Sequence, residues 1–187
     1  IGIGSYCELT GIGSRIAVAP GMTINTGTES STVRMDSTGA VRASFGISSH
    51  GQGLETTLAQ IIAEELGVTL DDVDIAQGDT ALMAHGTGTY ASRSTVLAGG
   101  AAILAARAVR EKVVRAASHL FEAAPEDITT GNGRISVTGT DRTMTFRDLA
   151  RAVYSDMESL PRELRDELGH LEATKVYDPF FGTATSA

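Results

Sequence analysis

One stretch, residues 95–109 with the sequence TVLAGGAAILAARAV, constrains the fold of this chain most strongly. Its apolar and small residues occupy nearly every side of a helix, and such a helix is buried rather than laid on a surface. Charged residues follow from Arg107, so the predicted helix of residues 92–121 becomes amphipathic and turns Arg110 and Arg115 outward. Gly99 and Gly100 predict that another backbone comes close to this helix. Charge interrupts the run before about 18 apolar residues, so it does not predict a membrane span.

Shorter strands and helices are predicted around this helix. Alternation in STVRMD and AVRASFGIS, on either side of Ser-Thr-Gly, predicts a β-hairpin that buries Val33, Met35 and Phe45 on one face. Helical spacing predicts a helix over residues 54–66 that ends at Gly67, with a strand in DDVDIAQ after it, and so a β–α–β unit. The other expected elements are strands at 4–10 and 12–19, a loop at 20–28, a strand–turn–strand at 125–137, a capped helix at 145–154, a short helix after Pro161, and a last strand near 170–178 with no element after it. The fold class is therefore α+β, a mixed β-sheet with packed helices.

Length and charge narrow the possible functions. The 187 residues fit one domain over 1–187, or two intimate subdomains at about 1–90 and 91–187. A net charge of −8, with lysine only at Lys112 and Lys175, argues against a nucleic-acid partner. The single cysteine, Cys7, allows no internal disulfide or four-cysteine cluster and is expected to be a small hydrophobe on a strand. No signal peptide is visible, which favours a cytoplasmic location, and both ends suggest a piece of a larger or processed polypeptide.

Two polar loops precede predicted helices. SHGQG, residues 49–53, leads into the helix at Leu54, and GTGTYASRS, residues 86–94, leads into the long helix. Unpaired N–H groups at a helix N-terminus attract anions, and glycine lets backbone come close to a ligand. The amide of Gln52 suits the edge of a heterocycle or a terminal oxo group. The two loops therefore indicate an anionic ligand at paired helix N-termini, although such loops also serve as ordinary caps and turns.

Other candidate groups carry less information. His50 lies beside the Gln52 loop, whereas His85, His119 and His170 are scattered without metal-ligand spacing, so no direct metal ligand is predicted. Glu55 could act as a base, but a glutamate in a first turn is more often favoured by the helix dipole. Tyr90 could donate a hydrogen bond or simply pack, and Arg93 could pair with a phosphate or with a carboxylate of the fold. Neither G-x-G-x-x-G ahead of a helix nor a P-loop occurs.

Three segments in order carry a family resemblance: GQGLETTLAQIIAEELGV, DDVDIAQGDT and GTGTYASRS. Together they resemble the molybdopterin-binding large subunit of the molybdenum hydroxylases, the xanthine dehydrogenase and aldehyde oxidoreductase family, and most of all its aerobic carbon monoxide dehydrogenase-like branch. GIGSYCELTG and LEATKVYDP extend the resemblance over nearly the whole chain.

The resemblance implies a molybdenum cofactor on a pterin, often extended as molybdopterin cytosine dinucleotide. It implies contacts from the G-Q-G turn (His50, Gly51, Gln52, Gly53) and from the second loop (Thr89, Tyr90, Ala91, Ser92, Arg93, Ser94). It also implies hydroxylation of carbon monoxide, an aldehyde or an N-heterocycle with oxygen derived from water. The partners it implies are the rest of the large subunit, [2Fe–2S] clusters and FAD, the last two carried on other domains or subunits.

The sequence departs from the family pattern at several places. Leu54 stands where carbon monoxide dehydrogenase-like sequences often have histidine, and Ala91 replaces a common glycine. The family's catalytic glutamate belongs to a G-x-G-E motif that this sequence lacks, so no catalytic residue is expected within it and the isolated chain should have no turnover. An alternative is a non-catalytic assembly domain that has kept the fold without the cofactor.

Overall fold

A computed structural model describes residues 1–6, 8–13, 16–20, 22–24, 27–83, 85–156, 158–179 and 184–186. The prediction for Cys7 lies outside the described residues. In chain order the elements are β1 (Glu8–Thr10), β2 (Ile16–Ala19), β3 (Met22–Ile24), β4 (Glu29–Met35), β5 (Val41–Phe45), α1 (Leu54–Leu66), η1 (Leu70–Asp72), β6 (Val73–Gln77), α2 (Ser94–Phe121), η2 (Pro125–Asp127), β7 (Ile128–Gly131), β8 (Arg134–Val137), β9 (Thr143–Thr145), α3 (Phe146–Tyr154), α4 (Arg162–Leu168), β10 (Glu172–Tyr177) and β11 (Ala184–Ser186).

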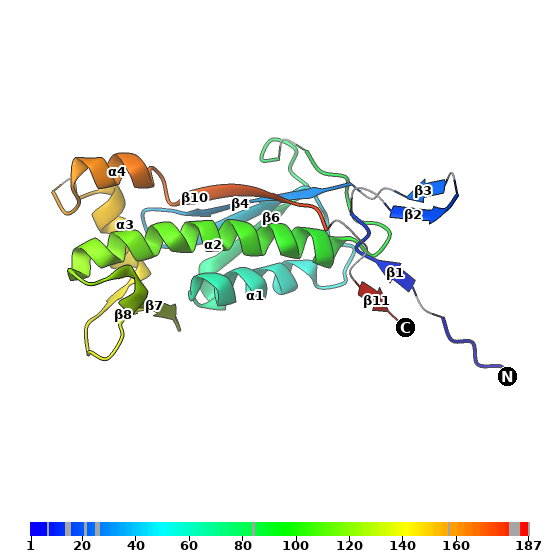
Figure 1. Cartoon of the computed structure of the whole chain (residues 1–187), viewed down its shortest axis with the longest axis horizontal. Helices are drawn as coiled ribbons and strands as arrows, with labels where there is room; N and C mark the ends of the chain where they lie inside the picture. The colour runs from blue at the N-terminus through cyan, green and yellow to red at the C-terminus, as the bar shows by residue number, and fades with distance from the viewer. Residues whose placement is uncertain are drawn as a thin grey trace.

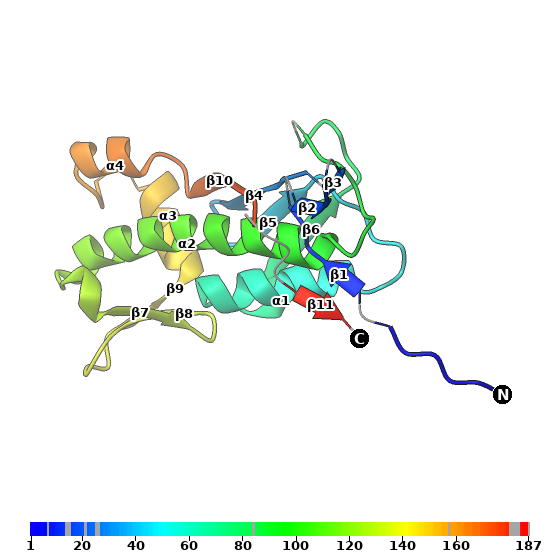
Figure 2. The ribbon, with the colours of Figure 1, turned by 45° about the vertical axis from the view of Figure 1, so that its right-hand side comes forward.

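The centre of the molecule is a four-stranded mixed sheet, in the order β10-β4-β5-β6, with α1 and α2 packed against it. In Figure 1 the long helix α2 runs along the molecule, and α1 lies beside it. Figure 2 shows the sheet strands behind these two helices. The predicted α+β class is confirmed, and β5, α1 and β6 form the predicted β–α–β unit, with β5 and β6 parallel.

The β4–β5 hairpin follows its sequence pattern closely. Val33, Met35 and Phe45 are fully buried, as their alternation predicts. The turn is closed by Asp36, whose Oδ1 accepts hydrogen bonds from Thr38 N at 2.7 Å and Thr38 Oγ1 at 2.6 Å. These bonds stabilise the carboxylate and hold the pKa of Asp36 below its ordinary value.

The long helix is buried along most of its length. Fully buried alanines, among them Ala98, Ala102 and Ala105, allow α1 and the sheet to come close to it. The neighbours at its two glycines are side chains, not the backbone expected from the sequence. A Cβ at Gly100 would lie closer than 3.0 Å to the ring of Tyr177, and one at Gly99 would meet Ile61 at 3.3 Å.

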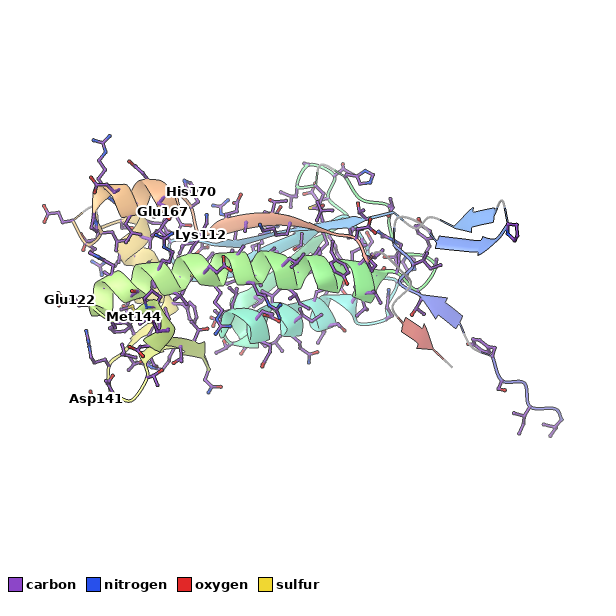
Figure 3. All side chains as sticks on the ribbon, in the orientation of Figure 1. Lys112, Glu122, Asp141, Met144, Glu167 and His170 are labelled. Carbon is purple, nitrogen blue, oxygen red and sulfur yellow. The ribbon has the colours of Figure 1, made fainter. Side chains whose placement is uncertain are left out.

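A smaller layer lies at the far end of α2. Strands β7, β8 and β9 form an antiparallel sheet beside α3, whereas α4 lies on the other side of α2 (Figure 2). The capping box predicted at Thr145 forms, since Asp148 N donates to Thr145 Oγ1 at 3.1 Å, and hydrogen bonding from Thr145 lowers the pKa of Asp148. Figure 3 labels Lys112 and His170 at this end. Lys112 Nζ donates to the carbonyl oxygen of His170 at 2.7 Å and so joins α2 to the start of β10.

Several boundaries differ from the predictions. Helix α2 begins at Ser94 rather than Ser92, because Ala91 and Ser92 have left-handed φ values of 50° that a helix cannot contain. Strand β3 lies inside the segment predicted as a loop at 20–28 and pairs with β2. Strand β11 follows the segment predicted to be last and pairs with β1. Strand β11 pairs with a strand at the other end of the chain, and β3 pairs with β2 through an irregular register. A local sequence pattern encodes neither kind of pairing.

Candidate functional site

The two polar loops meet at one hollow, at the end of the molecule where α1 and α2 begin. Both helices start at the same end in Figures 1 and 2. The hollow has a volume of about 350 Å³ and is lined by residues of both turns, which lie some forty positions apart in the chain. The lining residues are His50, Gln52, Thr89, Tyr90, Ala91, Ser92, Arg93, Ser94 and Thr95. The structure thus brings together the residues that the resemblance singles out, and Gly51 and Gly53 flank Gln52.

The first turn orients the side-chain amide of Gln52. Its Oε1 accepts hydrogen bonds from His50 N at 2.6 Å and Ser49 Oγ at 3.4 Å. No acceptor for its Nε2 lies among the described residues, and the side chain is exposed. Gly51 and Gly53 have φ values of 102° and 75°, yet a Cβ at either would meet nothing within 4 Å. These glycines are therefore required by the backbone conformation, which leaves the Gln52 amide open at the hollow.

The second loop is fixed to the first by Thr89. Thr89 Oγ1 donates to the carbonyl oxygen of Ser48 at 2.6 Å and accepts from Ser48 N at 3.2 Å. Ser94 Oγ donates to the same hydroxyl at 3.0 Å. The Thr89 hydroxyl is thus fully used within the protein, so Thr89 holds the two turns in register.

A close backbone contact sets the course of the same loop. A Cβ at Gly86 would lie closer than 3.0 Å to the backbone of Gly46, which directly follows β5. The loop can take this path only because both residues lack side chains. In the sequence Gly86 is one of several loop glycines, and no local pattern marks Gly46 as its neighbour.

Arg93 pairs with a carboxylate of the fold, one of the two roles open to it from sequence. It is fully buried, and its Nη1 lies 2.9 Å from Glu29 Oε2. Its guanidinium carbon also lies 5.6 Å from the centre of the half-exposed Tyr90 ring, within cation–π range. Glu29 was not predicted as a site residue, since a lone glutamate at a strand start carries no signal of such a partner.

The turn before α1 and the first turn of α2 line the hollow, and neither helix has a side-chain cap. Gly53, the N-cap of α1, has no side chain to cap the helix, and Arg93, the N-cap of α2, directs its side chain to Glu29. The first N–H groups of each helix therefore rely on water or a ligand for acceptors. Among the described residues, Arg93 is the only lysine or arginine that lines the hollow, and Glu29 neutralises it. An anion here would be held by backbone N–H and hydroxyl groups and by the helix dipoles.

We expect Ala91→Gly to stabilise the protein by about 1 kcal/mol, because glycine adopts a left-handed conformation without the cost that alanine bears. Chemical denaturation would measure this gain. Thr95→Gly, on the helical first turn of α2, should instead lower the stability. A lower stability for Ala91→Gly would show that the strain lies elsewhere.

The remaining candidates from the sequence are Glu55, as a base, and groups of metal-ligating residues. The Glu55 carboxylate accepts a hydrogen bond from Gln77 Nε2 across the β–α–β unit. Within the described part of the chain, no group of histidine, cysteine, aspartate and glutamate is arranged to hold a metal ion. The same residues contain no helix with the length and apolar character needed to cross a membrane.

Comparison with known proteins places this arrangement in a family. The model of the molybdopterin cofactor-binding domain matches residues 1–186. The nicotine 6-hydroxylase large subunit of Paenarthrobacter nicotinovorans is 35% identical over 188 aligned residues, which is 100% of this chain and 23% of that protein. The carbon monoxide dehydrogenase large chain of Afipia carboxidovorans is 39% identical over 96% of this chain and 21% of its own length.

The same relationship holds in three dimensions. The crystal structure of quinoline 2-oxidoreductase from Pseudomonas putida 86 superposes with a TM-score of 0.80 and 42% identity, over 93% of this chain and 22% of that one. The chain spans about a fifth of the length of these relatives. By sequence and by fold, the chain belongs to the molybdopterin cofactor-binding domain family of the molybdenum hydroxylases.

Proposed function

We propose that this chain binds the pterin and phosphate portion of a molybdenum cofactor, in the form of molybdopterin cytosine dinucleotide, within a molybdenum hydroxylase. The observation that carries this proposal is that the turn before α1 and the first turn of α2 line one hollow, and that neither helix has a side-chain cap. A cofactor with phosphate groups matches such a site, since it brings the acceptors that those amides lack.

The chain's residues divide between contact and support. Backbone N–H groups of Ser94 and Thr95, on the first turn of α2, would hold phosphate oxygens. The Gln52 amide would face the pterin end beside the metal, since its Oε1 is already engaged and its Nε2 remains a donor. Tyr90, 47% exposed, would cover the cofactor at the rim of the hollow. Thr89 would keep both turns in place.

The cofactor, when bound, would supply the redox chemistry that hydroxylates a substrate with oxygen derived from water, while the chain binds and orients it. The relatives' names refer to nicotine, quinoline and carbon monoxide. We therefore propose carbon monoxide, an aldehyde or an N-heterocycle as the substrate class. The catalytic base and the substrate-binding loops would lie outside this chain, as would the FAD and [2Fe–2S] partners, so the chain alone would have no turnover.

The test is Gln52→Ala in the complete enzyme, purified from a host that makes the cofactor. We expect molybdenum content or turnover to fall by about tenfold or more, the usual size of effect for a residue supporting a metal site. Gln60→Ala is a matched control, because Gln60 is an exposed glutamine on α1 outside the hollow. Wild-type metal content and rate in Gln52→Ala would count against the assignment. A wild-type complex devoid of molybdenum and pterin would favour the alternative of a non-catalytic assembly domain.

A further inference from the structure

Among the described ion pairs, only the pair of Arg93 and Glu29 has both side chains fully buried. The others are partly exposed; Arg107 and Glu65, for example, have exposed fractions of 59% and 19%. A buried charge is costly unless it is paired and hydrogen-bonded, so this pair is retained despite a large desolvation cost. Its location beneath the second loop of the hollow suggests what it does.

The guanidinium of Arg93 binds three residues in two separate segments of the protein. Its Nη1 donates to Glu29 Oε2 at 2.9 Å and to the carbonyl oxygen of Gly88 at 2.5 Å. Its Nη2 donates to the carbonyl oxygen of Thr28 at 2.8 Å. One side chain therefore joins the start of β4 to the loop that leads into α2.

Glu29 is equally committed to the fold. Its Oε1 accepts a hydrogen bond from Ser30 N at 3.2 Å and lies 2.9 Å from the position that a Cβ on Gly46 would take. Glu29 thus lies beside the Gly46–Gly86 backbone contact as well as under the loop. If Arg93 turned toward a ligand in the hollow, Glu29 would remain buried and charged without its partner, which is strongly unfavourable.

We propose that Arg93 is a positioning residue and not a ligand of the cofactor phosphates, and that Glu29 is its necessary partner. Together they fix the backbone of residues 88–93, and so the direction of the first N–H groups of α2. The part of this inference that concerns the cofactor rests on the proposed function, whereas the part that concerns the loop does not.

A double-mutant cycle on the complete enzyme tests the proposal with Glu29→Gln, Arg93→Met and the two combined. The first readout is hydrogen exchange of the amides at 88–95. We expect each single variant to exchange about a hundredfold faster than the wild type, because each leaves one buried partner unpaired. The double variant should exchange no faster than either single variant. The second readout is molybdenum and pterin content, which should fall alike in both single variants.

The two roles for Arg93 predict opposite results for Glu29→Gln. If Arg93 were a direct ligand, loss of Glu29 would free a cation toward the hollow, and cofactor content would stay constant or rise while only Arg93→Met lost it. That result would overturn the proposal, as would unchanged exchange at 88–95 in Glu29→Gln. Arg93→Lys keeps the charge without the planar fork, so it should exchange at an intermediate rate even if a harsher variant fails to fold.

The exposed Arg107–Glu65 pair supplies the control, and Arg107→Met should leave exchange at 88–95 unchanged. The exchange readout also separates this inference from the proposed function. Accelerated, non-additive exchange in the variants, together with a wild-type protein that carries no cofactor, would support the positioning pair and contradict the proposed function.

Discussion

Gly86→Ala is expected to lower the free energy of unfolding by about 3 kcal/mol and to open the hollow. The new Cβ would lie closer than 3.0 Å to the backbone of Gly46, which is held by β5 and cannot move as a flexible side chain could. The loop of residues 86–94 would have to lift away, and the Thr89 bonds to Ser48 would weaken with it. Chemical denaturation would measure the loss, and hydrogen exchange at 88–95 would locate it.

Gly131→Ala is the matched control for this effect. Gly131 does not have a positive φ, and a Cβ there would meet nothing within 4 Å. Gly131→Ala should therefore lower the free energy of unfolding only slightly, although the chemical change is the same as in Gly86→Ala. Equal stability losses for the two variants would show that the close approach of Gly46 and Gly86 does not matter.

Phe45→Ala should lower the free energy of unfolding by about 4 kcal/mol, because it leaves a cavity where a fully buried aromatic ring packs. Phe45 ends β5, pairs with Ser31 on β4 and with Gln77 on β6, and directly precedes Gly46. The cavity would therefore weaken the sheet at the edge that carries the hollow. Thermal or chemical unfolding would measure the loss.

Ser44→Ala gives the comparison, since Ser44 is the neighbouring residue on the opposite face of β5 and is only partly buried. We expect its effect to stay within about 0.5 kcal/mol. A small effect at Phe45 would mean that the core under the hollow collapses to fill the gap without loss.

The sequence predicted the parts of the fold that local patterns determine. The buried faces of β4 and β5, the end of α1 at Gly67 and the capping box at Thr145 each depend on residues a few positions apart. The polar loops before α1 and α2 also identified both sides of the hollow.

The remaining features depend on partners that the sequence does not place together. Nothing near Arg93 marks Glu29 as its partner, since the two lie 64 positions apart in the chain. The close contact of Gly46 with Gly86 is likewise visible only once the sheet has formed. Ala91 and Ser92 have left-handed backbone conformations, so α2 begins later than predicted. The sequence did not indicate this, because neither residue type favours that conformation. Long-range packing therefore decided the details of the site.

The most direct test of the shared hollow is a crystal structure of the complete enzyme with its cofactor bound. We expect phosphate oxygens of the cofactor within about 3 Å of the backbone nitrogens of Ser94 or Thr95, with the Gln52 amide beside the pterin. The guanidinium of Arg93 should still contact Glu29. A cofactor bound elsewhere, with water alone on the first amides of α2, would contradict the assignment of this hollow.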